Sequence, residues 1–264
     1  YHGGKFRLAP WLLQFFPPHG CYVEPFGGAA GVLLRKPRAY AEVYNDLDGE
    51  IVNLFRVVRD RGDELRMLLE ATPFAREEYR ASFPETDDPL EQARRTVIRS
   101  HMGFGSNALA RGVVSGFRSN SNRSGTTPAR DWRNLPDRIP AIIDRLRGVV
   151  IENRDALEVM QRHDRADTLH YCDPPYVHET RSGLERHGSG SEVGYSYEMT
   201  DNDHRAFAAG VKALAGMVIV SGYACTMYDL ELFSAWARYE IPALADGARD
   251  RIEVLWLNEA AAIQ

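Results

Sequence analysis

The chain has 264 residues, of which 44% are hydrophobic, which suits one large domain or one domain with a sizeable insertion. It contains no apolar run of about 18 residues, so we expect no membrane-spanning helix. The three cysteines (Cys21, Cys172 and Cys225) lie far apart without metal-ligand spacing. They predict reduced thiols in a cytoplasmic protein and no metal site.

The formal net charge of −5 is unevenly distributed along the chain. Between Arg94 and Arg133, eight arginines accompany a single acidic residue, Asp131. The net charge argues against a protein that coats nucleic acid. The asymmetry indicates one face for a polyanion on an otherwise acidic body.

The N-terminus reads Tyr1-His2-Gly3-Gly4-Lys5, with two flexible glycines between an aromatic residue and a cation. A loose tail has the same composition, and because the chain begins at a tyrosine we expect residues upstream of it. Residues 8–16 predict a short amphipathic helix that ends at Pro17-Pro18.

A turn of small residues follows the first predicted strand, residues 21–25. Phe26-Gly27-Gly28-Ala29-Ala30-Gly31 leads from this strand into a predicted helix over 32–36. Such a turn lets a backbone approach a nucleoside closely and directs helix N–H groups at it. A tight turn without a ligand uses similar residues. The turn lacks the Gly-x-Gly-x-x-Gly spacing, so it does not specifically indicate a pyrophosphate.

The second predicted strand, residues 39–44, ends at Asn45-Asp46 before a helix over 48–60. A Rossmann-type domain places the carboxylate that binds ribose hydroxyls at this point, so Asp46 is a candidate ligand. An N-cap for the following helix is the alternative role.

Residues 63–147 interrupt the alternation of strands and helices. Helical patterns cover residues 64–70, 76–82, 90–101 and 140–147. Residues 103–133 are rich in Gly, Ser, Asn and Arg. Arginines and amides contact phosphates and base edges, but a solvated loop has the same composition, so both interpretations stay open. The candidate DNA-binding residues are Arg111, Arg118, Asn120, Asn122 and Arg123.

The alternation then resumes with a strand over 149–154 and a helix over 156–163. Asp155 lies between them and could accept from the adenine amine of a cofactor or cap its helix. Residues 177–198 predict a polar loop long enough to act as a lid. Further elements are a helix over 199–214, a strand over 217–223, a short helix over 228–236 and a hairpin of strands 239–244 and 251–258.

Residues 168–173 predict a buried strand that ends in Asp173-Pro174-Pro175-Tyr176. The prolines remove two N–H donors, so the carbonyls of Asp173 and Pro174 are not used by a strand ladder. The Asp173 carboxylate and the Pro174 carbonyl can accept the two protons of an exocyclic amine, and Tyr176 can stack on the ring that carries it. Alternatively, the strand simply ends here, with Asp173 as a turn residue.

Seven predicted strands indicate an α/β fold with helices on both faces of a mixed sheet. The first five strands alternate with helices and should be parallel, and the terminal hairpin adds antiparallel pairing. Ligands of such sheets bind beyond the carboxyl ends of the strands. Asp46, Asp155, Asp173 and the turn at residues 26–28 all fall there.

Four motifs, in this order, resemble the Dam-type DNA adenine-N6 methyltransferases of the alpha group. They are Tyr1-x-Gly-Gly-Lys5, Glu24-Pro-Phe-Gly-Gly28, Asn45-Asp46 and Asp173-Pro-Pro-Tyr176. The resemblance covers essentially the whole chain and implies a Rossmann-like class I methyltransferase fold. It implies a catalytic domain of residues 1–62 and 148–264 that binds S-adenosyl-L-methionine, and a helical DNA target-recognition insertion of residues 63–147.

The same resemblance implies methyl transfer to N6 of an adenine flipped out of double-stranded DNA, without a metal. A cognate restriction endonuclease is a further candidate partner. The implied catalytic residues are Asp173, Pro174, Pro175 and Tyr176. The implied cofactor-binding residues are Tyr1, Lys5, Pro25, Phe26, Gly27, Gly28, Asp46, Asp155 and Asp173. The insertion carries no base-reading signature, so no target sequence is implied.

Three alternatives stay open. An enzyme with the same chemistry could act on RNA adenine or on a protein amide, although the arginine-rich insertion favours DNA. A nicotinamide-dependent oxidoreductase would explain the glycine turn and Asp46 but not Asp173-Pro-Pro-Tyr176. A non-catalytic DNA-binding module would not need an intact Asp173.

Overall fold

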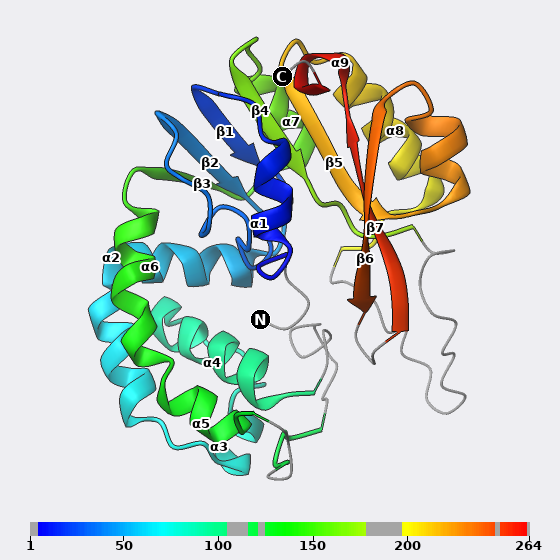
Figure 1. Cartoon of the computed structure of the whole chain (residues 1–264). Helices are drawn as coiled ribbons and strands as arrows, with labels where there is room; N and C mark the ends of the chain where they lie inside the picture. Colours follow the sequence, from blue (N-terminus) through cyan, green and yellow to red (C-terminus); the bar gives the residue numbers. More distant parts are fainter. Residues whose placement is uncertain (1–4, 105–115, 121–124, 178–196, 246–248, 263–264) are drawn as a thin grey trace. The chain divides into compact units, whose positions relative to one another are not determined.

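The computed structural model describes residues 5–104, 116–120, 125–177, 197–245 and 249–262 (Figure 1). Contacts divide the chain into two compact units. One is built mainly from residues 48–151, and we call it the helical unit. The other combines residues 4–47 with 152–264, and we call it the sheet unit. The predicted insertion boundaries at residues 62 and 148 stay a prediction.

A seven-stranded sheet has the order β3-β2-β1-β4-β5-β7-β6. Its strands are β1 (Cys21–Glu24), β2 (Ala41–Asn45), β3 (Val149–Glu152), β4 (Thr168–Cys172), β5 (Met217–Tyr223), β6 (Ala237–Ala245) and β7 (Arg249–Leu257). Strand β1 pairs in parallel with β2 and β4, and β4 pairs in parallel with β5. Strand β7 is antiparallel to both β5 and β6. The predicted Rossmann-like mixed sheet is confirmed.

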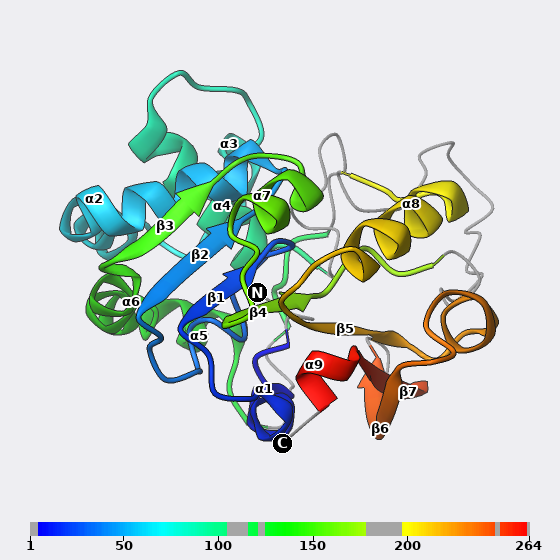
Figure 2. The ribbon, with the colours of Figure 1, turned by 90° about the horizontal axis from the view of Figure 1, so that it is seen from above.

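Helices cover both faces of the sheet (Figure 2). On one side lie α7 (Ala156–Arg162), α8 (Asp201–Lys212) and the π-helix Met227–Leu232, which overlaps the short helix predicted over 228–236. On the other side lie α1 (Ala9–Leu12), the 3₁₀ helix Leu13–Phe15 and α9 (Glu259–Ala262). Phe207 and Met160 pack with Val220 and Trp256 of the sheet in the core of the first side. This burial supplies the main driving force for the fold.

The predicted helix over 32–36 is not present. Residues 28–35 form consecutive turns, in which Leu34 N donates to Ala30 O at 2.9 Å and Arg35 N to Val32 O at 2.9 Å. Gly28 and Ala30 have φ values of 48° and 51°, which lie outside the helical region, and Pro37 leaves little room for a regular helix to develop.

The helical unit contains five α-helices among its described residues. They are α2 (Gly49–Ala71), α3 (Arg76–Ala81), α4 (Pro89–Met102), α5 (Pro128–Arg133) and α6 (Ile139–Leu146), with a 3₁₀ turn at Pro136–Arg138. The two helices predicted over 48–60 and 64–70 form one element with non-helical backbone at Arg61. Helix α5 lies inside the region predicted as a loop, because Thr127 caps it and Trp132 is buried.

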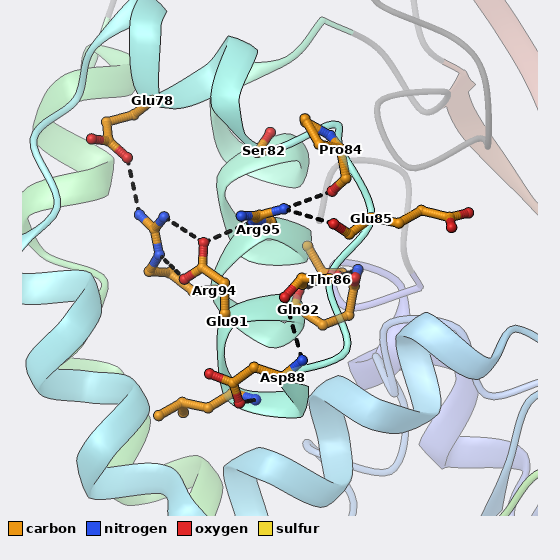
Figure 3. A network of polar contacts seen from close by, with 12 residues as sticks. Glu78, Ser82, Pro84, Glu85, Thr86, Asp88, Glu91, Gln92, Arg94 and Arg95 are labelled. Atoms are coloured by element: carbon orange, nitrogen blue, oxygen red, sulfur yellow. Dashed lines mark hydrogen bonds and ion pairs between the residues drawn. The ribbon is translucent and has the colours of Figure 1, made fainter.

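Three of the eight arginines between Arg94 and Arg133 form ion pairs inside the helical unit. Arg94 donates to Glu78 at 3.0 Å and to Glu91 at 2.7 Å, and Arg95 donates to the same Glu91 at 2.7 Å (Figure 3). Hydrogen bonding by Arg94 lowers the pKa of Glu91 to about 2. Arg99 is buried and pairs with Glu50. The predicted polyanion-binding face therefore cannot include every arginine of residues 94–133.

Within the described residues, no helix has both the length and the apolar character needed to cross a bilayer.

Candidate active site

Asp173 lies directly after β4 and is held through one carboxylate oxygen. Lys5 Nζ lies 3.2 Å from Asp173 Oδ1, and Ser221 Oγ donates to the same oxygen at 3.1 Å. Ser221 Oγ also lies 2.9 Å from the hydroxyl of Tyr171. Within the described part of the chain, every polar contact of the Asp173 side chain engages Oδ1. Among the described residues, Oδ2 has no such contact and could accept from a ligand.

Lys5 is a buried cation at the centre of this cluster, with a relative exposure of 6%. Its ammonium group contacts Asp173, Glu253 and the Tyr176 hydroxyl. Burial lowers the pKa of Lys5, but the nearby carboxylates of Asp173 and Glu253 outweigh burial, so the pKa lies above its ordinary value. Lys5 therefore stays protonated through the neutral range.

The chain reaches this position by passing closely over Gly31. A Cβ on Gly31 would lie 2.9 Å from Phe6 N and 3.2 Å from Lys5 N. Any larger residue at position 31 would have to displace that backbone. The small-residue turn after β1 thus also places the Lys5 side chain against Asp173.

The prolines and Tyr176 line a small internal space at the end of β4 and β5. Its other walls include Ser221, Gly222 and Tyr223, and it holds ≈ 10 Å³, about the volume of one water. The rings of Tyr176 and Tyr223 are 4.4 Å apart at 48°. Among the described residues, no hydrogen bond reaches the Pro174 carbonyl.

The glycine turn is fixed by the tip of β2. Gly28 N donates to Asp46 Oδ2 at 2.7 Å, and the Tyr44 hydroxyl donates to Gly28 O at 2.6 Å. A Cβ on Gly27 would lie 2.1 Å from the Tyr44 ring, so that position requires glycine. Gly28 has φ +48°, and a Cβ there would meet no atom of the described residues within 4 Å. The turn is thus supported by β2 and open at Gly28.

Buried Asn45, at the end of β2, forms hydrogen bonds with residues that follow β1 and β3. Its Nδ2 donates to Pro25 O at 2.9 Å and to Arg154 O at 3.0 Å, and its Oδ1 accepts from Arg154 N at 2.9 Å. Phe26 packs its ring edge-on against Phe207 of α8, with centroids 5.4 Å apart. These contacts fix the backbone of Pro25 and Phe26 beside the turn.

Asp155 caps α7, because its Oδ1 accepts from Leu157 N at 2.9 Å and Glu158 N at 3.1 Å. This is the capping alternative raised from the sequence, and a contact of Asp155 with a cofactor stays a prediction. Arg118 N donates to Met102 O at 2.8 Å, and the Asn120 side chain is exposed. A DNA-binding role for these two residues also stays a prediction. Tyr1, Arg111, Asn122, Arg123, residues 178–196 of the predicted lid and residues 246–248 of the hairpin turn lie outside the described residues.

The sequence analysis missed four residues of the Asp173 cluster: Glu253, Ser221, Tyr171 and Tyr223. The signal for two of them was a polar residue beside a run of buried apolar residues. Ser221 directly follows Val218-Ile219-Val220, and Glu253 directly precedes Val254 to Leu257. Neither signal names a partner, because the partners lie on other strands.

These residues fit a nucleoside-bearing methyl donor. The open side of Gly28 gives room for close approach, and Asp46 supplies a carboxylate at the adjacent strand tip. Among the described residues, no group of three or more His, Cys, Asp or Glu side chains could hold a metal ion.

Comparison with known proteins agrees with this chemistry. A family model described as D12 class N6 adenine-specific DNA methyltransferase matches residues 1–237. A DNA adenine methylase of Haemophilus influenzae is 27% identical over 188 residues, which are 66% of this chain and 62% of that protein. The type II methyltransferase M1.LlaDCHI of Lactococcus lactis subsp. cremoris is 26% identical over 218 residues, which are 74% of this chain and 70% of that protein. The matched part thus spans less than two thirds of the Haemophilus protein. With Asp173-Pro-Pro-Tyr176 and the glycine turn at the carboxyl ends of its parallel strands, the chain belongs to the D12 class N6 adenine-specific DNA methyltransferase family.

Proposed function

We propose that the protein transfers a methyl group from S-adenosyl-L-methionine to N6 of an adenine flipped out of double-stranded DNA. The observation that carries this proposal is the way Asp173 is held. Lys5 and Ser221 both engage Oδ1, which leaves Oδ2 and the Pro174 carbonyl to accept the two protons of an exocyclic amine. Family membership identifies the amine as that of adenine.

Each side chain of the cluster has a distinct task in this reaction. Asp173 Oδ2 and Pro174 O draw the amine protons toward themselves, so that the nitrogen lone pair becomes available. When bound, S-adenosyl-L-methionine would supply an electrophilic methyl group on a sulfonium sulfur, and this sulfur would leave as a thioether on transfer. Tyr176 stacks on the base, and the proton that the nitrogen loses can pass to Asp173. Positioning and exclusion of water then supply most of the acceleration.

The cofactor would bind over the glycine turn, with Asp46 and Gly28 nearest to its nucleoside and Lys5 beside Asp173. Tyr1, Pro25, Phe26 and Gly27 would complete this site. The contact between Gly28 N and Asp46 Oδ2 supports the proposal, because one carboxylate then orders the turn and faces the ligand-binding edge of the sheet.

Asp46→Ala is expected to weaken binding of S-adenosyl-L-methionine by about tenfold, in line with the loss of a hydrogen bond to a charged group. Isothermal titration calorimetry measures this affinity. Asp48→Ala is the matched control, since Asp48 caps α2 by accepting from Glu50 N at 2.9 Å. The control should lose about 1 kcal/mol of stability but no affinity. Unchanged affinity in Asp46→Ala would leave Asp46 with a purely structural role.

Replacing Arg118 and Arg123 together by alanine is expected to weaken DNA binding. The plot of log affinity against log salt should become less steep by at most about 2, since each phosphate contact contributes about 0.9. Replacement of Arg66 and Arg80, whose ion pairs with Glu70 and Glu77 lie on exposed helix surfaces, is the control. Equal salt dependence in both double variants would move the DNA-binding surface to another part of the chain.

Two assays separate this proposal from its alternatives. Calorimetry should show binding of S-adenosyl-L-methionine and none of NAD, whereas the reverse result would favour an oxidoreductase. With a labelled methyl donor, label should enter unmodified duplex DNA and not RNA or protein. Label in RNA alone would reassign the substrate, and binding without transfer would favour a DNA-binding module. The name of the Lactococcus relative keeps a cognate restriction endonuclease as a candidate partner.

A further inference from the structure

Glu253 is a buried carboxylate at the start of the buried, apolar half of β7. It is 2% exposed and precedes the fully or almost fully buried residues Val254, Leu255, Trp256 and Leu257 of β7. It lies opposite Tyr223 of β5 in the sheet register. A charge in such a place is costly unless it is paired, so its partner is informative.

The partner of Glu253 is Lys5, which has three acceptors around one ammonium group. Lys5 Nζ contacts Glu253 Oε1, Asp173 Oδ1 and the Tyr176 hydroxyl. An ammonium group has three N–H donors, so these three acceptors can fix its position in three directions. If Glu253 were absent, Lys5 would be held only by the two residues that it helps to place.

We propose that Glu253 is a positioning residue for methyl transfer, which anchors Lys5 so that Lys5 in turn fixes Asp173 and Tyr176. This inference rests on the proposed function. Glu253 lies 77 residues beyond Tyr176 in sequence and outside the region matched by the family model, which ends at residue 237.

The charges explain why an acid is useful at this position. A single lysine paired only with Asp173 would neutralise that carboxylate and weaken it as an acceptor for the amine protons. When Glu253 shares the lysine, the three groups carry a net negative charge. The Asp173 carboxylate then keeps part of its negative charge. Fold stability alone does not require this arrangement, because well-packed apolar residues often replace a buried ion pair without loss.

The cluster also predicts that the methylation rate falls at acid pH, and we call this fall the acid limb. Burial raises the pKa of Glu253 to about 6, with Lys5 opposing the shift and Asp173 adding to it. The titratable groups around Glu253 are Lys5, Asp173 and Tyr171, with Tyr223 as its cross-strand neighbour on β5. The anchored state needs ionised Glu253, so kcat should be full above this pKa and fall as the pH drops through about 6.

The experiment compares Glu253→Gln with the parent in steady-state methylation of duplex DNA. We expect kcat to fall about 10- to 100-fold, as for a misplaced catalytic group, with KM for donor and DNA within about 2-fold. The acid limb near pH 6 should disappear in the variant. In a Lys5→Met background, Glu253→Gln should cause no further loss, because Glu253 acts through Lys5.

Glu42→Gln is the matched control, because it breaks a second buried pair of the same kind. Glu42 Oε1 lies 2.9 Å from Lys36 Nζ, and both side chains are almost fully buried. Lys36 and Glu42 belong to a separate cluster, in which Lys36 Nζ also donates to Pro37 O at 2.6 Å and Glu42 Oε1 accepts from Ala39 N at 3.1 Å. The control should lose stability as Glu253→Gln does but keep the parental kcat and the acid limb.

The outcomes separate this inference from the proposed function. A parent that methylates DNA, together with Glu253→Gln at the parental kcat or with its acid limb intact, would overturn the role of Glu253 alone. If Glu253→Gln does not fold, the pH dependence of the parent protein provides the test. A parental kcat that is unchanged between pH 7 and pH 5 would overturn the proposed role of Glu253. A parent that binds the donor but methylates no DNA would overturn the proposed function, and this inference with it.

Discussion

Asp173→Ala is expected to reduce methyl transfer by about 10³-fold or more, while the fold is retained. The carboxylate is one of only two acceptors proposed for the amine protons, and it is lost in this variant. The backbone of β4 ends at Cys172, so its ladder with β1 and β5 does not depend on the Asp173 side chain. Single-turnover assays with labelled donor measure the rate.

A matched substitution at the opposite end of the same strand controls for damage to β4. Asp167 directly precedes β4, and its exposed side chain pairs only with Arg165, at 3.4 Å, among the described residues. Asp167→Ala should keep the parental rate. If Asp173→Ala methylates DNA as fast as Asp167→Ala, the catalytic assignment of Asp173 is wrong.

Gly28→Ala is expected to weaken donor binding by about 100-fold at a small cost in stability. Among the described residues, the new Cβ would meet no atom within 4 Å, so it would project into the space that the proposed cofactor needs. The left-handed backbone at φ +48° costs an alanine about 1–2 kcal/mol, and Ala30 already adopts φ 51° in the same turn. Calorimetry gives the affinity, and thermal unfolding gives the stability.

Gly148→Ala separates backbone strain from ligand exclusion. Gly148 has φ +82° and likewise has no atom within 4 Å of a Cβ, but it precedes β3 at the end of the strand away from the site. Its variant should lose similar stability and keep the parental affinity. Equal affinities in the two variants would mean that the donor does not bind over Gly28.

The strands were predictable because their signals are local. Met217 to Tyr223 is a continuous apolar run, as a strand covered on both faces requires, and the Pro174-Pro175 pair marks the end of β4. Asp173 and the glycine turn were also predictable as neighbours, because the carboxyl ends of parallel strands meet at one edge of a sheet. Helix α8 was indicated by its capping box at Thr200 and Asp203.

The remaining features depend on contacts that a sequence pattern does not encode. Lys5 and Glu253 are 248 residues apart and meet only through the strand order of the sheet. The arginines at 94, 95 and 99 look basic in composition, yet acidic partners on their own helix and on neighbouring helices neutralise them. The turns at residues 28–35 replace a helix because the backbone of Gly28 and Ala30 adopts positive φ.

The most direct measurement is base-resolved detection of N6-methyladenine in DNA from cells that lack other adenine methylases. Cells that express the parent protein should carry the modification at adenines within one recurring sequence, and cells that express Asp173→Ala should carry none. Unmodified DNA in cells that contain the folded parent protein would contradict the account, as would equal modification with both proteins.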